Sequence, residues 1–289
     1  MRRAPALALV AALAAAACAS TPGDGIRVVA ALYPLAWVAE RVGGDLVAVE
    51  DLTPPGVEAH DATLSAAQRA DVASADVVLL VGTGGFQPDV ARAAAEASGR
   101  VVDVSAGLDL IPASGDLAVD PHLWLDPALL ASAVGPVAAA FAAADPAHAD
   151  DFAANAAATE DLLASLDAEF AERLAGCAFT TFVTTHEAFT YLARAYGLRQ
   201  VALEGPSPES EPSAASIERA LAAIEDGAAA PAVFAEATEA GRRVGGAVAR
   251  DAGVPLYGLA TLETDPAPLG YPAVMRANLE SLAGGLACP

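Results

Sequence analysis

The residues from Asp145 to Ala175, DPAHADDFAANAAATEDLLASLDAEFAERLA, form the longest helical pattern of the chain. Asp145 and Pro146 favour a helix start, because aspartate caps a helix and proline suits its first turn. Apolar side chains then recur at helical spacing at Phe152, Leu162, Leu163, Leu166, Phe170 and Leu174. About 30 residues would make a helix ~45 Å long at the α-helical rise. We therefore predict one backbone helix long enough to connect two lobes.

Short apolar strands alternate with Ala-rich helical segments on both sides of this helix. The expected strands are 27–32, 47–52, 77–82, 100–104, 178–184, 200–203, 232–236 and 256–260. The helical segments between them include 35–42, 64–73, 88–97 and 212–226. This alternation predicts an α/β fold with two lobes, each a mainly parallel sheet flanked by helices.

The expected division of the chain follows from this pattern. We predict an N-terminal lobe over 25–140, a linking helix over 141–176 and a C-terminal lobe over 177–289. The helical pattern extends from Leu129, and we expect Pro136 and Pro146 to interrupt it, since proline removes a helix hydrogen bond.

The first 17 residues are expected to be a secretory signal. Arg2 and Arg3 precede the apolar run 6–17, which is too short to span a bilayer. Cys18 stands where a bacterial lipoprotein carries its lipidated cysteine, and ordinary cleavage near Ala19 is the alternative. Gly, Pro or charge interrupts every other apolar stretch, so no transmembrane helix is expected. We predict an extracytoplasmic protein, in the periplasm or on the cell surface, attached to a membrane only through a lipid on Cys18.

The chain is strongly acidic. It has 37 Asp and Glu residues against 15 basic residues, all of them Arg, and a formal net charge of −22. This charge argues against nucleic acid as a partner, because surfaces that bind nucleic acid are basic. The carboxylates can steer cations toward the protein, or they can simply form its solvated surface.

Two cysteines, Cys177 and Cys288, remain outside the N-terminal segment. Export would place them in an oxidising compartment, where we expect them to form a disulfide. The alternative is a pair of unrelated thiols. Their wide separation is unlike the short spacing of zinc-binding cysteines, so we do not expect them to bind metal.

Three of the four histidines follow predicted strands at their carboxyl ends. His60 follows 47–52, His122 lies in the loop after 100–104, and His186 comes directly after 178–184. Ligands of open α/β sheets bind outside the carboxyl ends of the strands. We therefore expect these three side chains to face one cleft between the lobes, whereas His148 is expected to be exposed and not a ligand.

A fourth ligand is expected from the loop after the last predicted strand. Glu263 is the preferred residue and Asp265 the reserve. Three imidazoles and one carboxylate suit Zn²⁺, whereas Ca²⁺ and Mg²⁺ sites consist of oxygen ligands. Mn²⁺ is less suited, because it binds weakly and is usually offered more oxygen.

Other acidic residues close in sequence to the predicted ligands have two interpretations each. Glu58 is either a substitute ligand or a solvated loop carboxylate. Asp126 and Glu187 either accept hydrogen bonds from the ligand imidazoles or cap helices.

Five segments of the chain carry a family pattern. They are PGVEAHD at 55–61, DPHLWLDP at 120–127, THEAFTYLARAYGL at 185–198, SEPS at 210–213 and VFAE at 233–236. In this order they resemble the metal-specific solute-binding proteins of zinc and manganese ABC importers, and the segment at 120–127 is the most specific. The resemblance implies two α/β lobes joined by one long helix, with the metal in the cleft.

The resemblance also implies the ligand set and the metal. It places the ligands at His60, His122, His186 and the acidic position Glu263, where the family often has the shorter Asp. Family members with histidine at the third position resemble zinc binders, so His186 implies zinc. Many zinc members carry a His-rich loop before the second motif, but 111–119 contains no histidine. Zinc would then be acquired directly or from a zinc chaperone.

The implied function is a monomeric zinc receptor that serves a cognate ABC permease and is not an enzyme. A manganese receptor of the same family is the nearest alternative. An exported zinc hydrolase is another, although the H-E-x-x-H pattern fails because Thr190 stands where the second histidine is needed. An adhesin is a third alternative.

Overall fold

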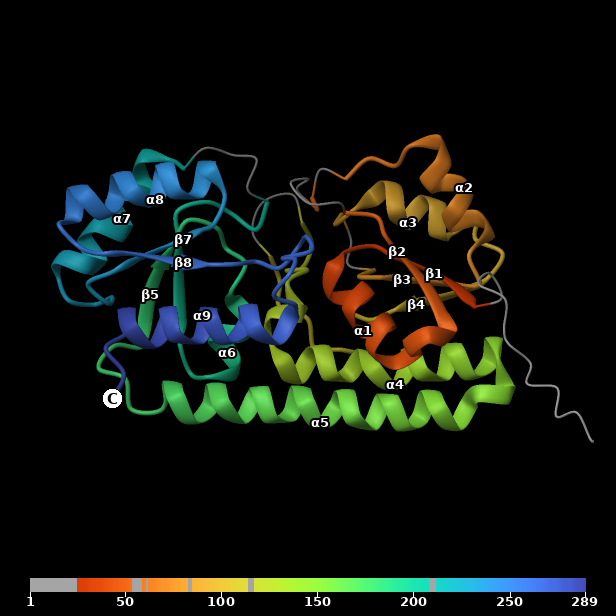
Figure 1. Cartoon of the computed structure of the whole chain (residues 1–289). Coiled ribbons are helices and arrows are strands. Elements are labelled where there is room, and N and C mark those ends of the chain that lie inside the picture. Colours follow the sequence, from red (N-terminus) through yellow and green to blue (C-terminus); the bar gives the residue numbers. More distant parts are fainter. Residues whose placement is uncertain (1–24, 54–58, 61, 83–84, 114–116, 208–211) are drawn as a thin grey trace, which may run out of the picture.

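The computed structural model describes residues 25–53, 59–60, 62–82, 85–113, 117–207 and 212–289. Within these ranges, two α/β lobes lie side by side over one long helix (Figure 1). The fold class predicted from the sequence is therefore confirmed. The signal segment, the lipidation at Cys18 and the reserve ligand Glu58 lie outside the described residues.

The N-terminal lobe is built on a four-stranded sheet of order β2-β1-β3-β4, in which every pairing is parallel. Its strands are β1 (Ile26–Ala30), β2 (Val47–Asp51), β3 (Val77–Leu80) and β4 (Arg100–Asp103). Its helices are α1 (Tyr33–Gly43), α2 (Ala66–Ser74) and α3 (Pro88–Ala94). The central strand β3 is buried along its whole length, which explains its unbroken apolar sequence.

The C-terminal lobe repeats this topology with the order β6-β5-β7-β8, again fully parallel. Its strands are β5 (Thr181–Thr184), β6 (Arg199–Ala202), β7 (Val233–Glu236) and β8 (Leu256–Leu259). Its helices are α6 (Thr190–Ala195), α7 (Ala214–Glu225), α8 (Glu239–Ala252) and α9 (Tyr271–Gly285). The strand order reverses between β1 and β3 and between β5 and β7, which is where open α/β sheets bind ligands.

The predicted backbone helix is α5 (Ala149–Leu174), preceded by a 3-10 turn at Pro146–His148. Its 26 residues span about 39 Å. It packs against α1 of the first lobe and α9 of the second, and Figure 1 shows it running beneath both. The predicted apolar stripe is buried, except that Leu162 is half-buried.

One expectation about the preceding helix, α4 (Pro127–Ala144), is wrong. Pro136 lies inside α4 and does not end it. The helix is also long and apolar enough to cross a membrane by length and composition alone, with a mean hydropathy of 1.7. In the fold, α4 packs against α5 and α1 and buries side chains such as Leu130 and Phe141. Its apolar composition therefore serves the core beneath the first lobe.

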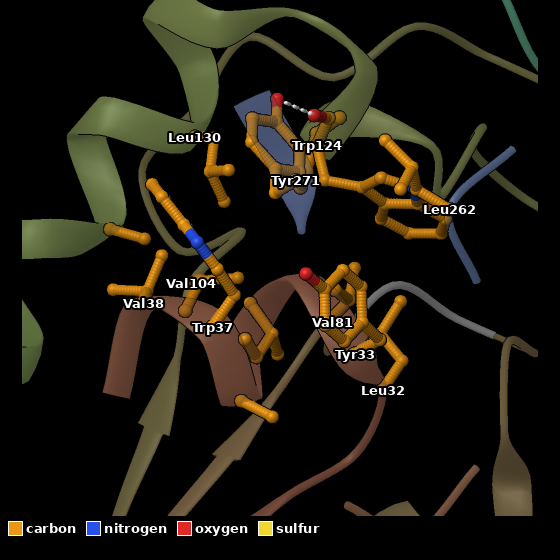
Figure 2. Packing of buried hydrophobic residues seen from close by; sticks show 14 of the residues in the cluster. Leu32, Tyr33, Trp37, Val38, Val81, Val104, Trp124, Leu130, Leu262 and Tyr271 are labelled. Carbon is orange, nitrogen blue, oxygen red and sulfur yellow. Dashed lines mark hydrogen bonds between the residues drawn. The ribbon is translucent and has the colours of Figure 1, made fainter. Parts of the chain in front are cut away.

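Aromatic side chains connect the two lobes by ring packing and hydrogen bonds. The rings of Trp37, from α1, and Tyr271, from α9, have centroids 5.0 Å apart. The hydroxyl of Tyr271 donates to the Trp124 carbonyl at 2.6 Å, as Figure 2 shows. Trp124 in turn donates from Nε1 to the Thr261 carbonyl at 2.7 Å. The lobes thus share one packed core and are not connected by the backbone helix alone.

A disulfide joins Cys177, which follows α5, to Cys288, which follows α9. Backbone hydrogen bonds from Ala178 and Phe179 to the segment after α9 extend this junction. The last helix is thereby attached to the start of the second lobe.

Candidate metal centre

Four loops bring the candidate ligands together at the carboxyl ends of the strands. His60 follows β2, His122 precedes the 3-10 turn Leu123–Leu125, His186 follows β5, and Glu263 follows β8. One nitrogen or oxygen atom from each of these four residues lies within 4.8 Å of every other. The first two residues come from the N-terminal lobe and the last two from the C-terminal lobe, so the cluster bridges the halves.

The spacing of these atoms matches a compact coordination shell. The Nε2 atoms of His60 and His122 are 3.3 Å apart. Oε1 of Glu263 lies 3.5 Å from Nε2 of His122 and 3.8 Å from Nε2 of His60. Two nitrogens in a tetrahedral zinc shell, each about 2.0–2.1 Å from the ion, would be ~3.3 Å apart. The four side chains are buried, so the atoms that would bind a cation are shielded from bulk water.

A carboxylate fixes the ring of His122. Oδ1 of Asp120 lies 2.7 Å from Nδ1 of His122 and also accepts the His122 backbone N–H at 2.9 Å. Because a carboxylate accepts, Nδ1 carries a hydrogen, so Nε2 is the ring nitrogen that binds a cation once it has lost its own proton. The backbone carbonyl of Asp120 accepts from the Tyr191 hydroxyl at 2.8 Å, which ties this loop to the other lobe.

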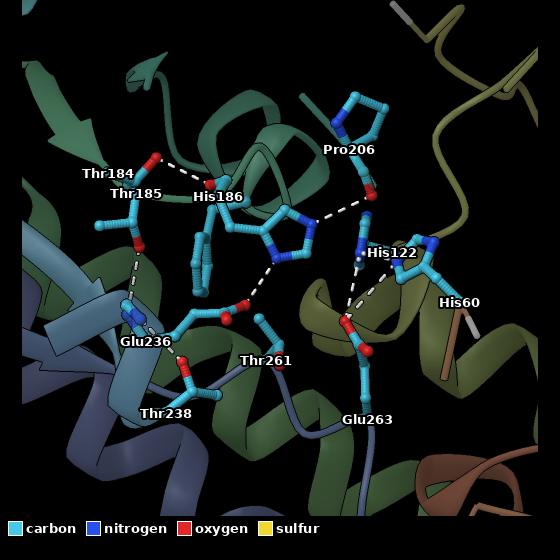
Figure 3. Close-up of polar contacts among 12 residues, drawn as sticks. His60, His122, Thr184, Thr185, His186, Pro206, Glu236, Thr238, Thr261 and Glu263 are labelled. Atoms are coloured by element: carbon cyan, nitrogen blue, oxygen red, sulfur yellow. Dashed lines mark hydrogen bonds and ion pairs between the residues drawn. The ribbon is translucent and has the colours of Figure 1, made fainter. Parts of the chain in front are cut away.

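The ring of His186 is held in a similar way. Its Nδ1 lies 2.6 Å from Oε1 of Glu236, at the end of β7. Its Nε2 lies 3.0 Å from the carbonyl oxygen of Pro206 (Figure 3). The carbonyl can only accept, so this nitrogen donates here and must give up that contact when it binds a cation.

Glu263 sits on a constrained backbone. The preceding residue, Leu262, adopts a left-handed conformation with φ of 59° and buries its side chain in the core. Such a conformation is rare for leucine and is retained where the surroundings impose it. Oε1 of Glu263 is buried and has no hydrogen-bond partner among the described residues. A buried carboxylate oxygen in this state is costly unless a cation satisfies it.

The electrostatics of the cluster favour a cation. Burial lowers the pKa of His60 to about 3, so its ring is neutral at pH 7. Burial opposes the charged forms of His122 and Glu263 as well, but the Asp120 carboxylate beside His122 and the contact between His122 and Glu263 outweigh it. With help from Asp120, the pKa of His122 rises to about 9, and the pKa of Glu263 falls to about 2. The carboxylate is therefore ionised at neutral pH.

Several predicted residues lie elsewhere. Asp265, the reserve ligand, is exposed and accepts from the Ala267 backbone N–H instead of joining the cluster. Asp126 caps α4 by accepting from the backbone N–H groups of Ala128 and Leu129, which was its second interpretation. His148 pairs with Asp145 at the turn before α5.

Sequence reasoning missed the two carboxylates that orient the imidazoles, Asp120 and Glu236. It proposed Asp126 and Glu187 for this role, and the structure gives the contacts to Asp120 and Glu236 instead. Both residues belong to segments that carry the family pattern: Asp120 begins DPHLWLDP and Glu236 ends VFAE. The predicted hydrogen bond from a ligand imidazole to Glu187 stays a prediction.

The chain also matches known proteins along almost its whole described length. Residues 28–285 match the family model of ZnuA, the periplasmic component A of the zinc-uptake complex. The chain is 31% identical over 299 residues to the zinc-binding lipoprotein AdcA of Streptococcus pneumoniae. This alignment covers 96% of this chain and 59% of that protein. It therefore spans only 59% of the length of that relative.

Two further relatives agree with this match. The high-affinity zinc uptake system protein ZnuA of Bacillus subtilis is 29% identical over 291 residues, covering 93% of this chain and 90% of that protein. A Zn(II)-bound variant of AdcAII from Streptococcus pneumoniae superposes with a TM-score of 0.78 at 28% identity, covering 92% of this chain and 100% of that one. With the fold, the site and the match over residues 28–285 in agreement, this chain belongs to the ZnuA family of periplasmic zinc-uptake components.

Proposed function

We propose that the chain is an extracytoplasmic receptor that binds one Zn²⁺ and delivers it to an ABC importer. His60, His122, His186 and Glu263 are the proposed ligands. The observation that carries this proposal is their convergence within 4.8 Å from four loops of two lobes. The names of the relatives, which describe zinc binding and zinc uptake, support the same conclusion.

The donor set favours zinc over manganese. Three imidazoles and one carboxylate suit a four-coordinate Zn²⁺, which is a borderline-soft cation. Mn²⁺ binds weakest in the divalent series and prefers more oxygen ligands. A manganese receptor would be the conclusion if Mn²⁺ displaced Zn²⁺ at equal concentrations.

The number of protein ligands also favours a receptor over a hydrolase. Catalytic zinc has three protein ligands and keeps one position open for water. Glu263 lies among the three histidines and supplies the fourth protein ligand. The relatives are named for binding and uptake of zinc, not for catalysis.

Delivery is proposed to need only local movements of the ligand loops. The backbone helix α5 and the contacts of Tyr271 and Trp124 oppose a wide opening of the lobes. We propose that the receptor docks on its permease as a monomer and acquires zinc directly or from a chaperone. The proposed chain layout is a signal over 1–17, lipidated Cys18, and lobes over 25–140 and 177–289 joined by 141–176.

Zinc titration of single-residue variants tests the ligand assignment. His122→Ala should lower Zn²⁺ affinity by more than about 100-fold, beyond the loss expected for an outer hydrogen-bond partner. His148→Ala is the matched control, because His148 is the histidine outside the cluster and should leave affinity unchanged. Competition with a chromophoric chelator measures both. Equal affinities for wild type and His122→Ala would refute the assignment.

Transport tests the receptor role separately from binding. In cells lacking the gene, zinc uptake under zinc limitation should be restored by the wild-type protein and not by His122→Ala. Restoration by a variant that binds no zinc would refute delivery through this site.

A further inference from the structure

A cavity of about 480 Å³ adjoins the metal centre within the C-terminal lobe. It lies between the start of α8 and the loop that follows β8. Its polar lining consists of three carboxylates and three hydroxyls, from Glu236, Glu239, Glu263, Thr238, Thr261 and Thr264. Among the described residues that line it, no basic side chain is present.

The inner wall of this cavity is part of the ligand cluster. Glu263 lies within reach of the imidazoles of His60 and His122, and Glu236 contacts His186. Both glutamates are less than a tenth exposed. Oε1 of Glu263, which has no hydrogen-bond partner among the described residues, faces the imidazoles from this wall residue. In Figure 3, Glu236, Thr238 and Thr261 lie on the side of His186 that faces away from Pro206, whereas Glu263 lies beneath His122 and His60.

The outer rim of the cavity reaches solvent at Glu239. This residue opens the first turn of α8 and is exposed. The lining thus runs from an exposed carboxylate, past threonine hydroxyls, to two buried carboxylates that touch the imidazoles. Carboxylate and hydroxyl oxygens can replace water molecules around a divalent cation. Negative charge in a low-dielectric recess also concentrates cations near it.

We propose that this cavity, which we call the vestibule, is the passage by which hydrated Zn²⁺ enters and leaves the metal centre. Glu239 is the first contact on this route, and the buried glutamates receive the ion next. The proposal rests on the proposed zinc-receptor function and adds the route. The competing route is the cleft between the lobes, on the Pro206 side of His186.

A plug placed in the vestibule tests the route. Ala237 lines the cavity, is exposed and is not one of the four proposed ligands. Ala237→Trp should slow Zn²⁺ association and chelator-driven dissociation together, each by about tenfold, because a gate changes rates and not equilibria. The dissociation constant should stay within about twofold of wild type, since the ligands are untouched.

Ala240→Trp is the matched control for the plug. Ala240 is exposed on the same first turn of α8 but does not line the vestibule. Stopped-flow mixing with a zinc-sensitive dye measures both rates, and circular dichroism checks that each variant is folded. Rates of Ala237→Trp equal to those of Ala240→Trp would overturn the proposal and favour the interlobe cleft.

A charge variant tests the proposal without adding bulk. Glu239→Gln should slow association about fourfold at 10 mM ionic strength and about twofold at 150 mM, with dissociation unchanged. Glu218→Gln, an exposed glutamate on α7, is the control and should change neither rate. Equal association rates for the two variants would count against Glu239 as the first contact. Absence of stoichiometric zinc binding in the wild-type protein would instead refute the proposed function.

Discussion

Replacing Asp120 by alanine should weaken zinc binding about 10- to 100-fold, although Asp120 is not a proposed ligand. Its Oδ1 holds Nδ1 of His122 at 2.7 Å and the His122 backbone N–H at 2.9 Å. These contacts fix both the rotation of the ring and the nitrogen that carries the hydrogen. Without them, the ring must adopt its rotation and place its remaining hydrogen on Nδ1 at the moment when zinc binds. The expected loss corresponds to about 1.4–2.8 kcal/mol.

Asp126 offers a matched control six positions later. It is also a buried aspartate, but its Oδ1 accepts from the backbone N–H groups of Ala128 and Leu129 at the start of α4. Asp126→Ala should therefore cost about 1 kcal/mol of unfolding free energy, as the loss of a helix cap does. Zinc affinity should not change, because Asp126 contacts none of the proposed ligands in the described structure.

Two measurements separate these effects. Chelator competition gives the zinc affinity, and denaturant unfolding of the metal-free protein gives the stability. Asp120→Asn adds a conservative test, since its amide oxygen still accepts from Nδ1 but without charge, and its affinity should fall between those of wild type and Asp120→Ala. Zinc binding by Asp120→Ala as tight as that of wild type, or an equal loss of affinity in Asp126→Ala, would refute this role for Asp120.

Two further predictions concern pH and the disulfide. The pKa of His122 rises from 6.5 to about 9, so its imidazolium stabilises the metal-free protein below pH 6.5 and this stability is lost as pH rises through 9. Zinc must displace that proton, and the proton of His186 wherever it is bound, so apparent affinity should rise at least about tenfold per pH unit from pH 7 to 9 in buffered chelator competition, whereas a flat profile would contradict metal binding by His122. Replacing Cys177 and Cys288 by serine should lower the unfolding free energy by roughly 4–5 kcal/mol in the chain-entropy model, given their separation of 111 residues. Guanidinium unfolding measures that loss, zinc affinity should be unchanged, and an unaltered midpoint would contradict the expectation.

Much of the fold could be predicted from local patterns. Each strand of the two sheets falls within or close to a predicted apolar run, because both faces of a parallel sheet are covered. The stripe from Phe152 to Leu174 predicted α5, since its spacing follows the helical period. The continuation of α4 through Pro136 could not be predicted, because packing against α5 and α1 outweighs the hydrogen bond that proline removes.

The candidate ligands could be predicted for a similar reason. Residues that follow parallel strands meet at one edge of the sheet whatever the exact register. The identity of the carboxylates that orient the imidazoles depends on strand register and on local backbone geometry. Glu236 reaches His186 only because β5 pairs with β7 in the register Val183 with Val233, and a parallel register cannot be derived from composition. Asp120 and Asp126 occur in one motif, and only the backbone geometry shows which of them faces the imidazole.

The charges around the cluster explain why it suits an exchangeable ion. Asp120, Glu236 and Glu263 are all buried, and buried carboxylates need compensation. In the metal-free protein, contacts with these carboxylates raise the pKa of His122 and of His186 against the effect of burial, so protonated imidazoles supply the positive charge. A divalent cation that displaces two protons leaves the buried charge unchanged. Loaded and empty states then differ little in electrostatic cost, which lets the same site bind its cargo tightly and yet be emptied.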